Sequence, residues 1–318
     1  AVPAGIAVTN PTYDYERTEL KLRGEYRPGR RLKLHLGYEK RRFERSAQER
    51  RETDTDRFWF RLNHRLGPGA DLDFDLFLEN RDGSSYESLD RAVSEQNPLM
   101  RKYNFSDRER AGFRLKGSVY PADRWDFGWE LEYGEDDYAE TTIGLTQTRY
   151  SRAGLNASWL IGRQGVLFGA VDTELVDADQ ANSQSFAVPD WAATTSDRFD
   201  SASVGFEHPE LIGAYCLELA YSWSQCSGEI SNNTGVSASR FPDLTSRRHR
   251  FDLGVTYPLG EAWVLGVNYL FENVKSDDWS LTGVDPSTVS NLLSMGADPF
   301  NYDVNVIYLS FRYVRPAR

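Results

Sequence analysis

Two cysteines and four histidines are the side chains of this sequence best suited to nucleophilic or metal chemistry. Neither Cys216 nor Cys226 belongs to a Cys-x-x-Cys pair or to the Cys-x-x-Cys-His sequence that attaches c-type haem. Two thiols are also too few for a four-cysteine zinc site. No histidine lies in a recognisable nucleophile motif with a base and an orienting group. The sequence therefore favours a protein that is not an enzyme. The histidines are His35, His64, His208 and His249.

Acidic runs are the next candidates, because carboxylate oxygens are the ligands that Ca²⁺ prefers. Residues 135–137 and 177–179 each carry two or more carboxylates, but neither run has the spacing of an EF-hand. We interpret both as solvated charge in long loops. Cys216 and Cys226 are expected at opposite ends of one strand, about 33 Å apart, which excludes a disulfide between them.

Charged residues elsewhere alternate with apolar residues, which is the period of a β-strand. In residues 57–66 the even-numbered side chains, on one face of the expected strand, are mostly aromatic or aliphatic, and the odd-numbered side chains, on the other face, are mostly basic. Residues 70–79 repeat the pattern with acidic side chains on the second face. The segment Gly67-Pro68-Gly69 between them is typical of a turn. The two segments are therefore predicted to form a hairpin.

The register of this hairpin can be predicted from residues equidistant from Pro68. Opposite charges then face each other on one side, and apolar residues face each other on the other side, with Leu66 opposite Ala70. The predicted pairs are Arg57 with Glu79, Arg61 with Asp75, Arg65 with Asp71, His64 with Leu72, Leu62 with Phe74 and Phe60 with Leu76.

Similar hairpins recur along the chain, for example across Pro28-Gly29 and across residues 121–123. In the second hairpin Arg114 and Lys116 are expected to face Asp126, Glu130 and Glu132. A lone strand closes the series at about residues 302–314. The pattern predicts about thirteen strands of about ten residues, the length that crosses a bilayer when tilted.

The connections differ at the two ends of these strands. One end has short turns, mostly with Gly or Pro, and the other has long polar connections at residues 46–54, 80–106, 134–147, 176–196, 225–245 and 275–300. This asymmetry is typical of bacterial outer-membrane barrels, whose short turns are periplasmic and whose long loops are extracellular. A soluble β-sandwich is the alternative, although its strands are usually shorter.

Aromatic residues near the ends of the apolar faces favour the barrel, because such barrels have aromatic girdles at both membrane interfaces. The residues are Trp125, Tyr133, Trp159, Tyr215, Trp223, Trp263, Phe271, Phe311 and Tyr313. Mean hydropathy is -0.59, and no apolar stretch is long enough for a transmembrane helix. The net charge of -11 argues against a nucleic-acid partner.

The sequence thus predicts an all-β fold, an antiparallel transmembrane β-barrel region over residues 1–318. A loop is expected at residues 1–12, strands at 13–314 and a tail at 315–318. Because bacterial barrels have even strand numbers and the first strand runs towards the short turns, we expect further strands before Tyr13. The start of the chain also lacks the charged and apolar regions of a signal peptide.

The charged face of these strands is predicted to line the lumen, either as a hydrated wall or as a surface that holds another protein. Its clearest members are Arg57, Arg61, Arg65, Asp71, Asp75, Glu79, Arg114 and Glu130.

Three segments resemble the MtrB/PioB family of decahaem-associated outer-membrane porins. They are residues 13–18, residues 97–110 before a strand, and residues 297–305 before the last strand. In the second segment the residues that carry the resemblance are Asn97, Pro98, Arg101, Lys102, Asp107 and Arg108. The chain corresponds to about the C-terminal half of a family member, and residues 314–318 run past the usual terminal aromatic residue.

The resemblance implies a sheath in the outer membrane around a periplasmic multihaem cytochrome that conducts electrons across that membrane. Haem is then expected only in the partner, and this chain is expected to bind no cofactor or metal. A second, extracellular multihaem cytochrome is the implied partner at the long loops. A general diffusion porin for small solutes is the alternative function.

Overall fold

The computed structural model describes residues 12–46, 48–87, 97–138, 140–185, 187–260, 262–281 and 301–314. These residues form one β-sheet in which neighbours along the chain are neighbours in the sheet. The long strands are β1 (Tyr15–Tyr26), β2 (Leu32–Arg45), β3 (Glu52–Gly67), β4 (Ala70–Gly83), β6 (Arg108–Ala122), β7 (Trp125–Asp137), β8 (Ile143–Ile161), β9 (Gly165–Asn182), β10 (Trp191–Ile212), β11 (Tyr215–Asn233), β13 (Leu244–Leu259), β14 (Trp263–Asp277) and β15 (Tyr302–Tyr313).

Three short elements lie in the connections. They are β5 (Met100–Arg101), which pairs in parallel with β8, β12 (Ala238–Arg240), which pairs with β11, and the 3₁₀ turn η1 (Trp279–Leu281). None of the described helical segments has the length and apolar character needed to cross a membrane.

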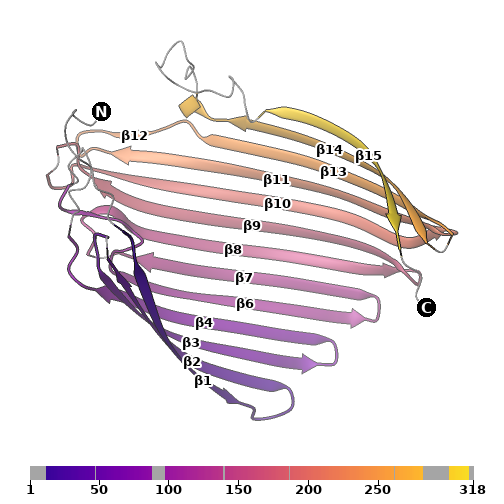
Figure 1. Ribbon diagram of the computed structural model, residues 1–318, viewed down its shortest axis with the longest axis horizontal. Coiled ribbons are helices and arrows are strands. Elements are labelled where there is room, and N and C mark those ends of the chain that lie inside the picture. The colour runs from indigo at the N-terminus through magenta and orange to yellow at the C-terminus, as the bar shows by residue number, and fades with distance from the viewer. Residues whose placement is uncertain are drawn as a thin grey trace.

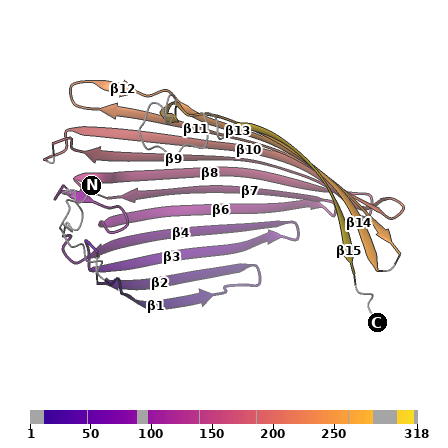
Figure 2. The same cartoon turned by 45° about the horizontal axis from the view of Figure 1, so that its top comes forward.

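The sheet is curved and open, with β1 and β15 as its two edges (Figure 1). Short hairpins join the strands at one end, and the longer connections gather at the other (Figures 1 and 2). All pairs between the long strands are antiparallel, as predicted. The predicted asymmetry of the two ends is therefore present in the described part of the chain.

The two faces of the sheet differ in chemistry. On the apolar face large side chains are open, and Leu36, Phe58 and Leu155 are each about 60 % exposed. The opposite face carries the charged side chains of the alternating pattern. We call this face the polar wall. Exposed apolar side chains over a continuous sheet are costly in water but stable in lipid. The apolar face is therefore the membrane face of the sheet.

The predicted register of the hairpin from β3 to β4 is confirmed from Arg57↔Glu79 to Arg65↔Asp71. The prediction was wrong at the turn, where Gly67 and not Leu66 pairs with Ala70. A bulge between Arg65 and Gly67 shifts the register by one residue, which symmetry about Pro68 could not reveal.

The strands are longer than predicted, from 12 residues in β1 to 22 residues in β10. Several segments predicted as loop are therefore strand, and the connection predicted at residues 134–147 is reduced to residues 138–142 between β7 and β8. The acidic runs at 135–137 and 177–179 lie in β7 and β9, not in loops. Beyond the membrane both faces meet water, so the hydrogen-bonded ladder continues after the apolar alternation has ended.

Candidate functional site

Ion pairs between strands cover the polar wall of the N-terminal half. Arg61 contacts Asp75, Arg65 Nε lies 3.4 Å from Asp71 Oδ1, and Arg57 Nη1 lies 3.8 Å from Glu79 Oε2. The Arg65 side chain is 69 % exposed, so its pair is screened by solvent. These contacts place the predicted ladder on one face and neutralise its charges row by row.

The next hairpin, from β6 to β7, continues this arrangement. Arg114 is directly opposite Glu132, and its Nη2 lies 3.3 Å from Glu132 Oε1, while its Nε lies 3.5 Å from Glu130 Oε1. Both carboxylates belong to the acidic group predicted to face it. Lys116 Nζ lies 3.1 Å from the same Glu130 oxygen. Arg114 is therefore shared between two carboxylates and Glu130 between two cations, and the wall presents paired charge rather than a field of one sign.

The polar wall changes character across β9, β10 and β11. Next to the charged Asp172, small neutral side chains face one another across these strands, as in Ala170↔Ser203 and Ser203↔Ser222. This smooth strip was not predicted from the sequence, because serine and alanine give no strong signal for a strand face. Its further members are Ser201, Ala220 and Ser224.

The buried charges gather at the long-loop end. The Glu79 side chain is 2 % exposed, contacts Arg108, and lies 3.1 Å from Arg41 Nη2 and 3.8 Å from Arg57 Nη1. The sequence predicted Glu79 only as one rung of the ladder with Arg57. The structure instead places it among three arginines from three strands.

Asp136 is the second buried carboxylate of this cluster. It contacts Arg110, lies 3.7 Å from Arg108 Nη1 and accepts a hydrogen bond of 3.4 Å from the Tyr138 hydroxyl. Burial raises the pKa of Tyr138. The charge of Asp136 is thus compensated by Arg108 and Arg110. Within the described ranges, no group of three or more His, Cys, Asp or Glu side chains is placed to hold a metal.

The family-like segment at residues 97–107 folds over the polar side of these strand ends. Asn97 Oδ1 accepts a hydrogen bond of 2.9 Å from the Leu99 amide, and its Nδ2 donates to the Ala187 carbonyl at 3.0 Å. Arg101 Nη1 donates to the Pro98 carbonyl at 2.9 Å. The first part of the segment is therefore a side-chain-supported turn, tied to the connection between β9 and β10.

The second part of the segment is held by charges. Lys102 contacts Glu49, whose side chain is 4 % exposed, and Asp107 Oδ1 lies 2.8 Å from Arg50 Nη2. Arg108 is the first residue of β6, so the segment predicted before this strand, residues 97–110, extends three residues too far. Lys102 and Asp107, two residues of the family-like segment, position it on the strand ends.

Two arginines that the sequence analysis missed complete this attachment. Arg50 donates to the Ser84 carbonyl at 2.7 Å and to the Phe105 carbonyl at 2.9 Å. Arg81 donates to the Ser106 carbonyl at 2.9 Å. Both satisfy backbone groups far away in sequence, which a local motif search could not detect.

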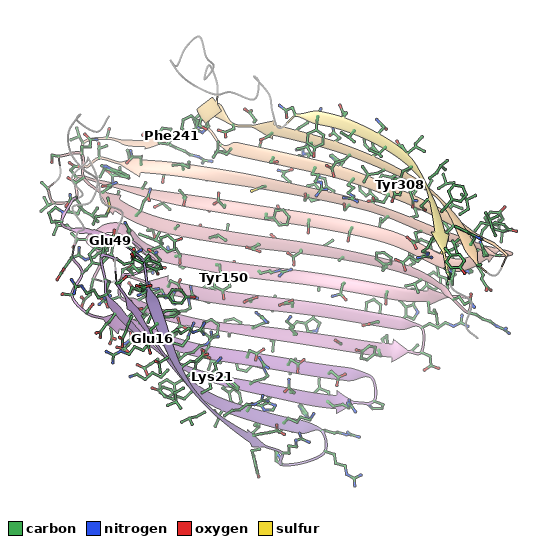
Figure 3. All side chains as sticks on the ribbon, in the orientation of Figure 1. Glu16, Lys21, Glu49, Tyr150, Phe241 and Tyr308 are labelled. Atoms are coloured by element: carbon green, nitrogen blue, oxygen red, sulfur yellow. The ribbon has the colours of Figure 1, made fainter. Side chains whose placement is uncertain are left out.

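We call this assembly of residues 49–53, 79–81, 97–108, 136–138 and 140–143 the loop core. Figure 3 shows Glu49 among densely packed side chains at this end of the sheet. The buried hydrophobic side chains of the described residues all lie at this end of the sheet, namely Phe105, Tyr138, Ile143 and Ala193. The described protein interior is therefore at the loop end, whereas the middle of the sheet has only its two surfaces.

Three of the four histidines take part in ordinary polar contacts. His35 Nδ1 lies 3.1 Å from Arg23 Nη2, His249 Nδ1 lies 2.8 Å from the Tyr221 hydroxyl, and His208 Nδ1 accepts from the Glu210 amide at 3.1 Å. Both cysteines are free thiols. Within the described ranges, the histidines and cysteines do not form a pair of nucleophile and general base.

Three comparisons identify the class of this sheet. The family of outer membrane beta-barrel porins named MtrB/PioB matches residues 1–314. The outer membrane protein MtrB of Shewanella baltica strain OS185 is 26 % identical over 310 residues, which are 97 % of this chain and 44 % of that protein. The chain thus spans less than half the length of this relative.

Solved structures with a similar fold are outer-membrane receptors. The ferric citrate transporter FecA has a TM-score of 0.52 at 10 % identity, over 94 % of this chain and 53 % of that one. The siderophore receptor PiuA of Acinetobacter baumannii has a TM-score of 0.50 at 11 % identity, over 81 % of this chain and 48 % of that one. The membrane face, the polar wall and the matched family agree, and the chain belongs to the MtrB/PioB family of outer-membrane β-barrel porins.

Proposed function

We propose that this chain forms part of the wall of a sheath that surrounds a periplasmic multihaem cytochrome and carries it across the outer membrane. The proposal rests on family membership and on the chemistry of the polar wall. The wall excludes lipid and keeps haem groups close enough for electron tunnelling, while all redox chemistry belongs to the cytochrome. The chain itself binds no haem and catalyses no reaction, and an extracellular multihaem cytochrome meets it at the long-loop end.

The observation that carries the proposal is the paired charge of the polar wall. A protein held against unpaired charges would have to desolvate them at a large cost, whereas paired charges are already partly compensated. The wall pairs Arg61 with Asp75 and Lys116 with Glu130 across neighbouring strands. It therefore offers hydrogen-bonding groups to a protein surface at a lower desolvation cost.

The strip of small side chains on β9, β10 and β11 supports close packing. Ser203 lies between Ala170 and Ser222, so the wall has little relief at these three positions, next to the Phe168 ring that covers Gly205. A rigid partner can approach a flat wall of this kind over a wide area. Thirteen strands at about 4.8 Å each extend for roughly 60 Å along the curve, which suits a protein-sized occupant.

The direct test is co-purification from outer membranes of the full-length protein that contains this chain. A tagged full-length protein should bring down a haem-staining polypeptide with an absorption band near the Soret region. A matched variant with Ser203→Trp and Ser222→Trp should retain the folded barrel and lose most of the haem stain. Folded barrels without any associated haem protein, from cells that express c-type cytochromes, would contradict the proposal.

A diffusion porin is the second candidate, and the loop core favours it in one respect. Residues 97–107 cover the polar side of the strand ends, where an inward loop can set the width of an aqueous pore. Measurement of sugar flux into vesicles that hold the haem-free barrel separates the functions. Rapid flux that persists in the presence of the cytochrome would favour the porin.

The Arg61–Asp75 pair gives a quantitative prediction for the sheath. With the lumen filled by water, a double-mutant cycle of Arg61→Gln and Asp75→Asn should give a coupling of about 0.2–1 kcal/mol. With the cytochrome bound, water is partly excluded and the coupling should increase. Chemical unfolding of the full-length barrel in both states measures it. An absence of coupling in both states would contradict the location of this pair in the lumen.

Orientation in the membrane gives a second prediction. After replacement of Cys216 and Cys226 by serine, Val236→Cys should react with an impermeant thiol reagent on intact cells, because Val236 is 97 % exposed in a long-loop connection. Gln164→Cys lies in a short turn and should react only after the outer membrane is opened. Labelling in the opposite order would place the long loops in the periplasm.

A further inference from the structure

Arg247 of β13 and Lys275 of β14 are directly opposite each other on the membrane face. They share the parity of the pair Phe251↔Phe271, which lies four residues closer to the short turns on each strand. Like charges that are directly opposite in an antiparallel sheet destabilise it. A compensating anion is therefore expected beside them.

The described part of the chain places no carboxylate in ion-pair contact with either cation. Other cations at the long-loop end of the membrane face each have a carboxylate within 4.0 Å, namely Lys40 with Asp56, Arg42 with Glu52, Arg149 with Asp179 and Arg198 with Asp200. Among the described residues no carboxylate lies within this distance of Arg247 or Lys275. Arg247 Nε donates only to the Gln225 side chain, at 3.3 Å. These two cations differ from the four named above because no carboxylate is in ion-pair contact with them, although Asp277 and Asp303 line the same groove.

Their height on the sheet matches the outer boundary of the membrane. Along β13 the membrane-facing side chains run from Tyr257 near the short turn to Phe251, and Arg247 follows beyond His249. Ten residues separate Tyr257 from Arg247, which is about 33 Å along the strand and about 25 Å along the membrane normal at a tilt of about 40°. Arg247 and Lys275 thus lie at the level of the lipid headgroups, next to the aromatic girdle residue Trp223.

The two cations line a groove of about 670 Å³. The same groove contains the Gln225 amide and two carboxylates, Asp277 and Asp303, and Asp303 accepts a hydrogen bond from Asn273. Cations would bind a phosphate, and carboxylates and amides would bind hydroxyl groups. The combination suits a phosphorylated sugar rather than a simple anion.

We infer that this groove binds the phosphorylated sugar headgroup of an outer-leaflet glycolipid, lipid A, while the acyl chains lie on the apolar face below it. Arg247 and Lys275 contact a phosphate, and Asp277 and Asp303 accept hydrogen bonds from sugar hydroxyls. The phosphate removes the repulsion between the two cations. The bound lipid also joins β13 to β14 at the outer boundary of the membrane.

The test uses the full-length protein in nanodiscs of phosphatidylcholine that contain bisphosphorylated lipid A. Native mass spectrometry counts the lipid A retained per protein. Each basic side chain near an anionic lipid surface contributes about 5-fold in affinity, so Arg247→Gln with Lys275→Gln should weaken retention about 30-fold. Enzymatically dephosphorylated lipid A should be retained weakly by the unmodified protein.

Two matched variants identify the cause. Arg248→Gln removes a cation from the next position of β13, but its side chain lies on the polar wall and pairs with Glu272. Arg198→Gln removes a compensated cation from the membrane face. Both should retain lipid A within about 2-fold of the unmodified protein, since neither contacts the groove.

Three results would overturn the inference. The first is equal loss of lipid A in the Arg248→Gln variant, which would indicate a general effect of charge. The second is equal retention of dephosphorylated and phosphorylated lipid A by the unmodified protein. The third is equal retention of phosphatidylglycerol when it competes with lipid A for that protein. Heat-modified migration on gels shows whether each barrel is folded. An unfolded double variant is replaced by Arg247→Lys with Lys275→Gln, which should lose about 5-fold.

Discussion

Replacement of Glu79 by glutamine should reduce the free energy of unfolding of the full-length barrel by about 3–5 kcal/mol. The substitution keeps the size of the side chain but removes a buried charge that Arg41, Arg57 and Arg108 surround. Those guanidinium groups would then repel one another in a site that water enters poorly. Urea unfolding in lipid vesicles, followed by tryptophan fluorescence, measures the loss.

Asp71→Asn is the matched control, because Asp71 belongs to the same polar wall and pairs with Arg65. The Asp71 side chain is 45 % exposed, so its pair is screened and the substitution should cost less than about 1 kcal/mol. Equal losses in the two variants would show that the loop core is not a buried cluster. Protease sensitivity of the segment at residues 97–107 should increase in Glu79→Gln alone.

An arginine in place of Leu76 should cost about 2–4 kcal/mol, which is the penalty for a charge at the bilayer midplane on the lipid side of a barrel. Leu76 lies midway between the short turn and the outer boundary on β4, between Phe60 and Phe113. The guanidinium would have to move towards a headgroup or draw water into the bilayer. The fraction of heat-modifiable barrel recovered from outer membranes, together with urea unfolding, measures the effect.

The neighbouring substitution Asp75→Asn tests the face assignment on the same strand. Asp75 points to the polar wall, where its pair with Arg61 is half exposed, so the barrel should lose about 1 kcal/mol or less. A larger loss for Asp75→Asn than for Leu76→Arg would reverse the membrane face and the polar wall. Together the two variants separate insertion into lipid from pairing within the lumen.

The sequence by itself determined the strand type, the two faces and most of the register. Alternation along one strand reports which face meets lipid, and complementary neighbours such as Arg61 with Asp75 and Leu62 with Phe74 report how two strands align. Both signals are local, because the partners are joined by a short turn. Other segments, at residues 13–18, 97–110 and 297–305, carried the resemblance to the family that the comparisons confirmed.

The length of the strands cannot be read from this alternation. Beyond the apolar band both faces are polar, so nothing in the alternation of residues 135–137 or 177–179 distinguishes a strand from a loop. The bulge between Arg65 and Gly67 likewise leaves no mark in the sequence, because glycine is compatible with many turn geometries. Hydrogen bonding to the neighbouring strand, not side-chain chemistry, fixes these positions.

Only the tertiary structure brought together the loop core. Glu79 meets Arg41 from β2 and Arg108 from β6, and Arg50 reaches the Phe105 carbonyl, so each contact joins elements that lie far apart along the chain. The sequence marks these residues as charged but cannot say which charges share a buried volume. Curvature of the sheet and the return of residues 97–107 over the strand ends create that volume. Because the cluster is buried, removal of one charged partner costs more there than in the exposed ladder.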